Sequence, residues 1–167
     1  MQSTLTNNST TFAPKETIPH DAPVHAIKCP TSWSQLNSSE QLYAYYMARA
    51  AWEGSKICWF QRSYESPALL VLFKLVFAEG TQNLKASTSD LVSELEWKQM
   101  VSYSAAVFQN CGNYKSFGDT KFVPELHPDQ LMKIIKASSG FKTHHKVINA
   151  IIGRIWREIY LEEAPLL

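Results

Sequence analysis

Apolar side chains recur at spacings of three and four residues over most of the chain after about residue 38, and polar stretches separate the runs. A capping box, in which Ser38 precedes Gln41 by three residues, predicts a helix over about residues 38–61, bent near Gly54. Ser66-Pro67 predicts the start of a second helix, which Gly80 ends. That helix is apolar on nearly all sides, so we expect it to need cover on several of them and the chain to fold poorly alone.

Three more helices are expected further along the chain. The patterns place them at about 89–111, from His127-Pro128-Asp129 onward, and at about 143–163. The polar residues 81–89 are interpreted as a connector, and Ser138-Ser139-Gly140 as a break. The side chains expected to face inward are Met100, Tyr103, Val107, Cys111, Leu131, Ile134, Ile135, Ile148, Ile151, Ile152, Ile155 and Ile159. No stretch predicts a strand, so the fold class is mainly α.

Aromatic residues are concentrated in the first predicted helix: Tyr43, Tyr45, Tyr46, Trp52 and Trp59. Such a set can serve as a stacking platform for a ligand, or it can fill a core and a domain interface. The second interpretation is favoured, because aromatic side chains are the usual filling of both. Residues 1–26 are polar and are interpreted as a flexible leader with solvated His20 and His25, and residues 27–167 as the helical segment of one incomplete domain.

Composition narrows the class of protein. The 167 residues hold 16 Lys and Arg against 15 Asp and Glu, a net charge of +1, which is not the basic excess that nucleic acids or anionic membranes attract. No apolar run approaches the roughly 18–20 residues that span a bilayer. The first 30 residues resemble neither a signal peptide nor a mitochondrial presequence, so we expect a cytoplasmic protein. Three widely spaced cysteines predict neither a disulfide framework nor a metal clip.

Catalytic motifs are missing from the sequence. It contains no glycine-rich phosphate loop, no Cys-x-x-Cys pair and no His-Glu-x-x-His motif, in its usual or its one-residue-longer form. His144 and His145 are adjacent, so on a helix they point about 100° apart and do not chelate one ion well. We therefore predict no catalytic residue and no metal ligand in this chain.

Residues 113–124, Asn-Tyr-Lys-Ser-Phe-Gly-Asp-Thr-Lys-Phe-Val-Pro, follow neither helical nor strand periodicity. Gly112 before them suits a helix C-cap with positive φ, Gly118 allows a tight bend, and Pro124 is expected to stop any following pairing or helix. Two interpretations stay open with equal weight. The stretch is either a functional loop or a surface loop whose aromatic side chains are held by the core.

This loop closely resembles a signature of the dipeptidyl peptidase III family. The stretch from Leu42 to Trp52, Leu-Tyr-Ala-Tyr-Tyr-Met-Ala-Arg-Ala-Ala-Trp, is similar to the same family, as are Glu65-Ser66-Pro67 and Asp21-Ala22-Pro23-Val24. All of them occur in the same order as in the family. The resemblance runs from about residue 18 to residue 135 and fades after that.

The resemblance implies a cytosolic zinc exopeptidase that removes dipeptides from the N-termini of short peptides. Such enzymes have two lobes, and zinc lies in the lobe opposite to the one that this chain resembles. The chain would then be the helical N-terminal part of the lower lobe, with loop 112–126 facing the cleft, and would be inactive alone because every zinc ligand and the general base lie elsewhere. Phe117 would contact the substrate; the residues supporting the loop would be Asn113, Tyr114, Lys115, Asp119 and Lys121. The alternative is a non-catalytic helical interaction module or a truncated product.

Overall fold

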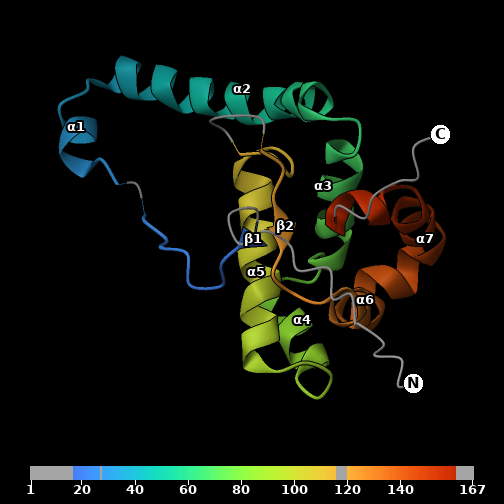
Figure 1. Cartoon of the computed structure of the whole chain (residues 1–167). Helices are drawn as coiled ribbons and strands as arrows, with labels where there is room; N and C mark the ends of the chain where they lie inside the picture. The colour runs from blue at the N-terminus through green and yellow to red at the C-terminus, as the bar shows by residue number, and fades with distance from the viewer. Residues whose placement is uncertain (1–16, 27, 116–119, 161–167) are drawn as a thin grey trace, which may run out of the picture.

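The computed structural model describes residues 17–26, 28–115 and 120–160. Within them the mainly α fold class is confirmed. The helices and strands are β1 (Thr17–Ile18), α1 (Pro30–Ser34), α2 (Ser38–Arg62), α3 (Ser66–Val76), α4 (Thr81–Thr88), α5 (Glu94–Gln109), β2 (Val123–Pro124), α6 (Pro128–Ala137) and α7 (Ser139–Tyr160). Figure 1 shows α2 lying across the top of the molecule, with α3 and α5 running downward from it.

The core forms around α3, which packs against α5 on one side and α7 on the other. The α3 side chains that are fully buried, or 1% exposed, are Leu69, Leu70, Leu72, Phe73 and Val76. Phe73 meets Tyr103 of α5 edge to face, with ring centroids 5.8 Å apart. This apolar helix was expected to need cover on several sides, and α5 and α7 of the same chain provide it.

Two helices begin at capping boxes: α2 begins at residue 38 as predicted but with a different cap, and α5 begins later than predicted. For α2 the cap is Asn37, one residue earlier than expected: its side chain accepts from the backbone N–H of Glu40, and the Glu40 carboxylate accepts from the Asn37 N–H. For α5 the cap is Ser93, paired in the same way with Glu96. The prediction of a helix from residue 89 was wrong because that box starts α5 at Glu94, five residues later.

Residues 81–88, predicted as a connector, form the helix α4, and Leu84 and Thr88 are its buried residues. The prediction was wrong because one apolar side chain among polar ones carries little periodicity, although Leu84 is sufficient to attach the helix to the core. A break is present at Ser138, but Ser139 and Gly140 are helical, because α7 begins at Ser139, earlier than predicted. Its backbone departs from helical geometry once, at His144.

A parallel pair of two-residue strands was not predicted. Thr17 of β1 lies opposite Val123 of β2, and Ile18 lies opposite Pro124. Two residues are too few to show alternation, and Pro124 pairs although it was expected to stop pairing. Beside the strands, the backbone N–H and Nδ1 of His20 lie 3.1 and 2.9 Å from the Glu125 carboxylate, so His20 is not simply solvated. The described end of the predicted leader is thus attached to the body.

The long helix α2 contains no buried residue. Of its aromatic side chains, Trp59 is half-buried and packs against the core, whereas Tyr43, Tyr45, Tyr46 and Trp52 are exposed. The core part of the favoured interpretation was therefore wrong for these four. The amphipathic pattern of α6 and α7 was interpreted correctly: Leu131, Ile134 and Ile135 are buried, and so are Ile148, Ile155 and Ile159. Over the described residues, no helix has both the length and the apolar character that a membrane span requires.

Candidate functional site

The loop singled out from the sequence has an ordered base. Tyr114 and Lys121 form an antiparallel bridge. On either side of it, the Lys115 N–H donates to the Thr120 carbonyl at 3.0 Å, and the Phe122 N–H donates to the Asn113 carbonyl at 2.9 Å. We call residues 113–115 and 120–122 the hairpin base. Residues 116–119, which include Phe117 and Asp119, lie outside the described residues.

The chain enters the hairpin base through two residues with positive φ. Cys111 has φ 55° and Gly112 has φ 151°, and the Gly112 N–H donates to the Val107 carbonyl at 2.9 Å. A Cβ on Gly112 would overlap the Ser66 hydroxyl oxygen. The expected positive-φ glycine after the helix is confirmed, and the same position also lets the hairpin approach the start of α3.

Arg62, the last residue of α2, connects that helix to the hairpin base. One terminal nitrogen of its guanidinium donates to the Tyr114 carbonyl at 3.1 Å and to the Lys115 carbonyl at 2.8 Å. Hydrogen bonds from a charged donor are stronger than neutral ones. This contact spans more than 50 residues of sequence and fixes one arm of the hairpin.

Lys121 fixes the other arm through two carboxylates. Its ammonium lies 2.7 Å from the Glu65 carboxylate and 2.6 Å from that of Glu158. The Lys121 side chain is 10% exposed, that of Glu65 is 2% exposed and that of Glu158 is 33% exposed. We call these three residues the Lys121 cluster. The Tyr114 ring adds a cation–π contact, with its centroid 5.5 Å from the Lys121 ammonium.

Burial alone would favour the neutral forms in this cluster, but the opposite charges outweigh it. Desolvation raises the pKa of Glu65, yet hydrogen bonds from Lys121 and Ser63 leave that pKa below its usual value. Desolvation lowers the pKa of Lys121, yet Glu158 and Glu65 leave that pKa above its usual value. At neutral pH the lysine therefore stays protonated and Glu65 stays ionised. The cluster suits positioning of the loop and not proton transfer or nucleophilic attack.

The hairpin base is also attached to the core. Phe122, Val123 and Asn113 are fully buried, and the Phe122 ring meets Tyr103 edge to face at 5.9 Å. Among the described residues the side-chain oxygen and nitrogen of Asn113 find no hydrogen-bond partner. Buried amides are normally paired, so Asn113 is an exception among the buried polar groups of the hairpin base.

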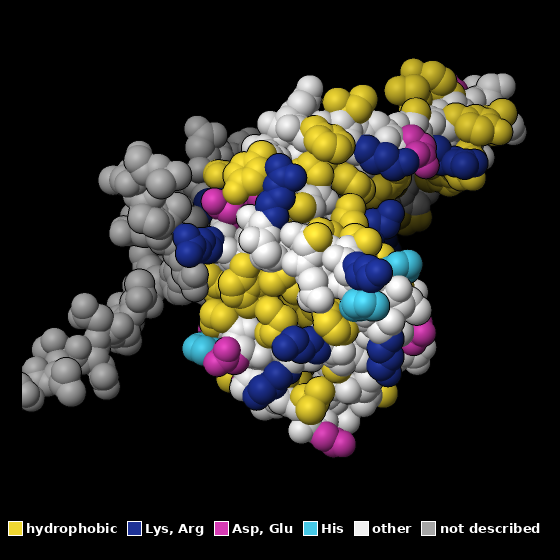
Figure 2. All heavy atoms as spheres, turned by 90° about the vertical axis from the view of Figure 1, so that its right-hand side faces the viewer, with side chains coloured by type: hydrophobic (Ala, Val, Ile, Leu, Met, Phe, Trp, Pro, Cys, Tyr) yellow, Lys and Arg dark blue, Asp and Glu magenta, His cyan; other side chains and the backbone are white. Residues whose placement is uncertain are grey.

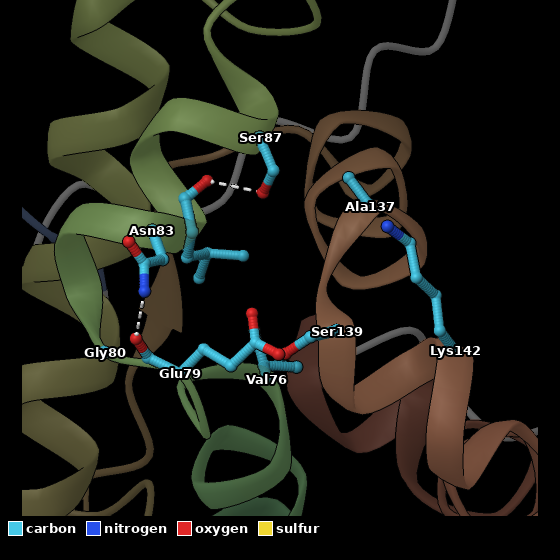
Figure 3. A pocket seen from close by; sticks show the side chains of 9 residues that line it. Val76, Glu79, Gly80, Asn83, Ser87, Ala137, Ser139 and Lys142 are labelled. Atoms are coloured by element: carbon cyan, nitrogen blue, oxygen red, sulfur yellow. Dashed lines mark hydrogen bonds between the residues drawn. The ribbon is translucent and has the colours of Figure 1, made fainter.

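A groove lies beside the hairpin base, where the ends of α2 and α5 approach each other. It has a volume of about 340 Å³, and its lining includes Cys58, Arg62 and Cys111. A second cavity, between α4 and the start of α7, has a volume of only about 60 Å³. Figure 3 shows its polar rim of Asn83, Ser87, Ser139 and Lys142. Sites for drug-sized molecules measure roughly 300–1,000 Å³, so of these two hollows the groove beside the hairpin base reaches the size of a ligand site and the second cavity does not.

A catalytic metal needs three or more convergent protein ligands. Among the residues that the structure describes, no group of three or more His, Cys, Asp or Glu is placed to hold an ion. His144 and His145 are both exposed on α7. The described residues therefore do not fit zinc, and no reaction step is assigned to a metal in this chain.

The sequence and the structure agree only partly on this site. Tyr114, Lys115, Lys121 and Asn113 do come together at one base. Arg62, Glu65 and Glu158 belong to the site but were not among the expected site residues. Glu158 belongs to α7, and no local signal in the sequence marks its pairing with Lys121, 37 residues away. The pairing of Glu158 with Lys121 depends on the three-dimensional fold, which a local sequence pattern does not contain.

Curated relatives of this chain share one name. It is 37% identical over 135 residues to dipeptidyl peptidase 3 of Nematostella vectensis, 41% identical over 128 residues to that of Dictyostelium discoideum, and 35% identical over 136 residues to that of Homo sapiens. The matches cover 76–80% of this chain and 18% of each relative. The chain thus spans less than a fifth of the length of these relatives. No protein-family model matches it.

Proposed function

The chain belongs, over the part that is matched, to the dipeptidyl peptidase 3 family, and from this premise we propose that it is the N-terminal portion of a cytoplasmic zinc exopeptidase. The whole enzyme would remove dipeptides from the N-termini of short peptides. This chain would line the peptide cleft and support its loop, and the zinc ligands and the general base would come from the rest of the polypeptide. The chain by itself would then be inactive.

The observation that carries this proposal is the identity of 35–41% to these three relatives over three quarters or more of the chain. At that level of identity a shared fold is expected over the matched part. The hairpin base supports the proposal further, because the contacts of Arg62 and Lys121 fix both arms of the loop to the body of the chain. Loops held on a rigid scaffold are common carriers of binding residues.

We assign substrate contact to Phe117 and support of the loop to Asn113, Tyr114, Lys115, Asp119 and Lys121. Phe117 lies between the two arms in sequence, and the contacts of Arg62 and Lys121 hold those arms. An aromatic ring offers a short peptide a large contact area without requiring one particular side chain. The Lys121 cluster would act only through the loop and would take no part in the chemistry.

The test uses a chimera in which this chain replaces the matched segment of the Dictyostelium discoideum relative. We expect Phe117→Ala mainly to raise KM and to reduce kcat/KM by about 5- to 150-fold, the equivalent of roughly 1–3 kcal/mol for a ring buried against substrate. The melting temperature should change little. Phe73→Leu is the matched control, because Phe73 is fully buried in α3, outside the hairpin base, and this change should lower the melting temperature without altering KM.

A Phe117→Ala chimera that melts early but keeps its KM would show that the ring belongs to the core, and the cleft assignment would be wrong. That result is separable from a failure to fold, because KM is measured on the enzyme that remains active.

A further inference from the structure

Two of the three cysteines line the same groove, the one beside the hairpin base. Cys58 belongs to α2 and is exposed, whereas Cys111 follows the end of α5 and is partly exposed. Figure 1 shows the upper end of α5 beneath α2. The two cysteines lie more than 50 residues apart in the sequence, so their spacing along the chain gave no sign that the fold brings both to one groove.

The segments that carry the two thiols are in close contact. Cys58 and Arg62 are four residues apart on α2 and therefore share a face of that helix. Gly112 directly follows Cys111, and a Cβ on Gly112 would lie 3.1 Å from Cγ of Arg62. A disulfide joins Cα atoms roughly 4.4–6.8 Å apart, so it needs such a close approach of its two segments.

The backbone at Cys111 is unusual. Among the residues that the structure describes, Cys111 is the one non-glycine residue with a positive φ, at 55°. Glycine and asparagine are the residues that this conformation favours, so backbone preference does not account for a thiol at this position. Outliers of this kind occur often at functional sites.

The lining of the groove is polar and carries a positive charge. Besides the two cysteines it contains Gln61, Arg62, Gln109 and Asn110, and no acidic residue. A cationic groove attracts small anions from solution. Oxidised glutathione is a small disulfide with a net negative charge at neutral pH, so this lining favours its approach to the two thiols.

We propose that Cys58 and Cys111 form a redox pair that closes to a disulfide by exchange with a small anionic disulfide of the oxidised glutathione class. The Cys58 thiolate attacks one sulfur of the small disulfide, which forms a mixed disulfide and releases one small thiol. The Cys111 thiolate then attacks the Cys58 sulfur and releases the second small thiol. Two protein thiols are oxidised to one disulfide, and their two protons pass to the two thiols that leave.

The new bond would tie α2 to the residue directly before Gly112, where the chain enters the hairpin base. It would therefore clamp the hairpin base to the end of α2, beside the Arg62 contacts. In a reducing compartment such a bond is transient and responds to oxidants. The inference goes beyond the proposed function and concerns this chain alone, so its test does not depend on peptidase activity.

The first experiment incubates the purified chain at low concentration with oxidised glutathione, blocks free thiols and digests the product with trypsin. We expect mass spectrometry to find residues 57–62, which contain Cys58, linked to residues 99–115, which contain Cys111. This link should exceed any link that involves Cys29 by about tenfold or more. Cys29→Ser should leave it unchanged, because Cys29 does not line the groove.

The test variants remove one thiol each. Cys58→Ser changes an exposed position, and Cys111→Asn introduces a residue that tolerates a positive φ, so circular dichroism should show unchanged helix content. The matched control adds Asn149→Cys to Cys111→Asn, which keeps three thiols in the chain. Asn149 is exposed on α7, which lies on the right of Figure 1 and so on the side that faces the viewer in Figure 2.

In the matched control, the yield of a link from Cys58 to the added thiol should be about tenfold lower than the native link, or less. Equal yields would overturn the proposal, because any two thiols would then react. Mixed disulfides with glutathione on both Cys58 and Cys111, without the linked peptides, would also overturn it, because the thiols would then act independently.

Hydrogen exchange measures the clamp itself. The N–H groups of Lys115 and Phe122 donate across the hairpin base, so their exchange reports how often it opens. Oxidation should slow their exchange about threefold or more in the native chain, and a reducing agent should reverse the change. Cys58→Ser should show no response. A disulfide that forms while this exchange stays unchanged would overturn the clamp.

Discussion

Replacing Lys121 by alanine should destabilise the chain more than any other single change of a charged residue at the hairpin base. The substitution removes the partner of a Glu65 carboxylate that is 2% exposed. Breaking a buried ion pair on one side costs about 3–5 kcal/mol, because a charge is left in an apolar surrounding. The Glu158 contact adds little, since a carboxylate that is 33% exposed is well solvated.

Urea unfolding followed by circular dichroism measures this loss. The matched control is Lys146→Ala, a change of the same type at an exposed position of α7. We expect a loss of about 3–5 kcal/mol for Lys121→Ala and less than about 0.5 kcal/mol for the control. Combining Lys121→Met with Glu65→Gln should recover part of the loss, since a neutral pair leaves no buried charge. If Lys121→Ala loses no more stability than Lys146→Ala, the Lys121 cluster does not hold the hairpin base.

Three further outcomes are expected. The native chain should be more stable than Glu65→Gln at neutral pH, and this difference in unfolding free energy should shrink as the pH falls below about 4. The reason is that folding lowers the pKa of Glu65. The stabilisation by the ionised Glu65 carboxylate is therefore present above the usual glutamate pKa and is lost as the pH falls through the pKa in the folded state. Urea midpoints at pH 3 and pH 7 check this, and an advantage that grows in acid would contradict it. Gly112→Ala should lower the unfolding free energy by roughly 1–3 kcal/mol, because the added Cβ would overlap the Ser66 hydroxyl at a backbone conformation that favours glycine. Gly54→Ala is the control, since nothing lies near that position, and it should cause no such loss. Equal urea midpoints for the two variants would exclude the overlap. The purified chain should bind no stoichiometric zinc at sub-micromolar concentration, and isothermal titration that finds one tight site would show that a ligand set had been missed.

Local features of this fold could be predicted, and relations between distant residues could not. The Ser66-Pro67 helix start and the inward faces of α6 and α7 follow from spacing and caps within a few residues. The Arg62 contacts and the Lys121 cluster join residues that lie tens of positions apart, and single-sequence patterns contain no such information.

The α2 helix also shows that burial is harder to predict from sequence than secondary structure is. Its sequence correctly predicted a helix, and its many aromatic side chains were interpreted as filling a core and a domain interface. Burial depends on which protein surrounds a helix, and among the described residues most of the aromatic side chains of α2 are exposed. Composition thus predicts that an apolar side chain will be covered in the working protein, but not by which part of it. The short strands failed for a simpler reason, because β1 and β2 have two residues each.

Dipeptide release by the covalent chimera tests the central claim most directly. In this protein the native chain replaces the matched segment of the Dictyostelium discoideum relative, and kcat/KM is compared with that of the unaltered relative on the same peptide. If the chain is a working N-terminal portion of such an enzyme, kcat/KM should stay within about tenfold, a difference of about 1.4 kcal/mol in transition-state stabilisation. A chimera that folds cooperatively but releases no dipeptide would contradict the account.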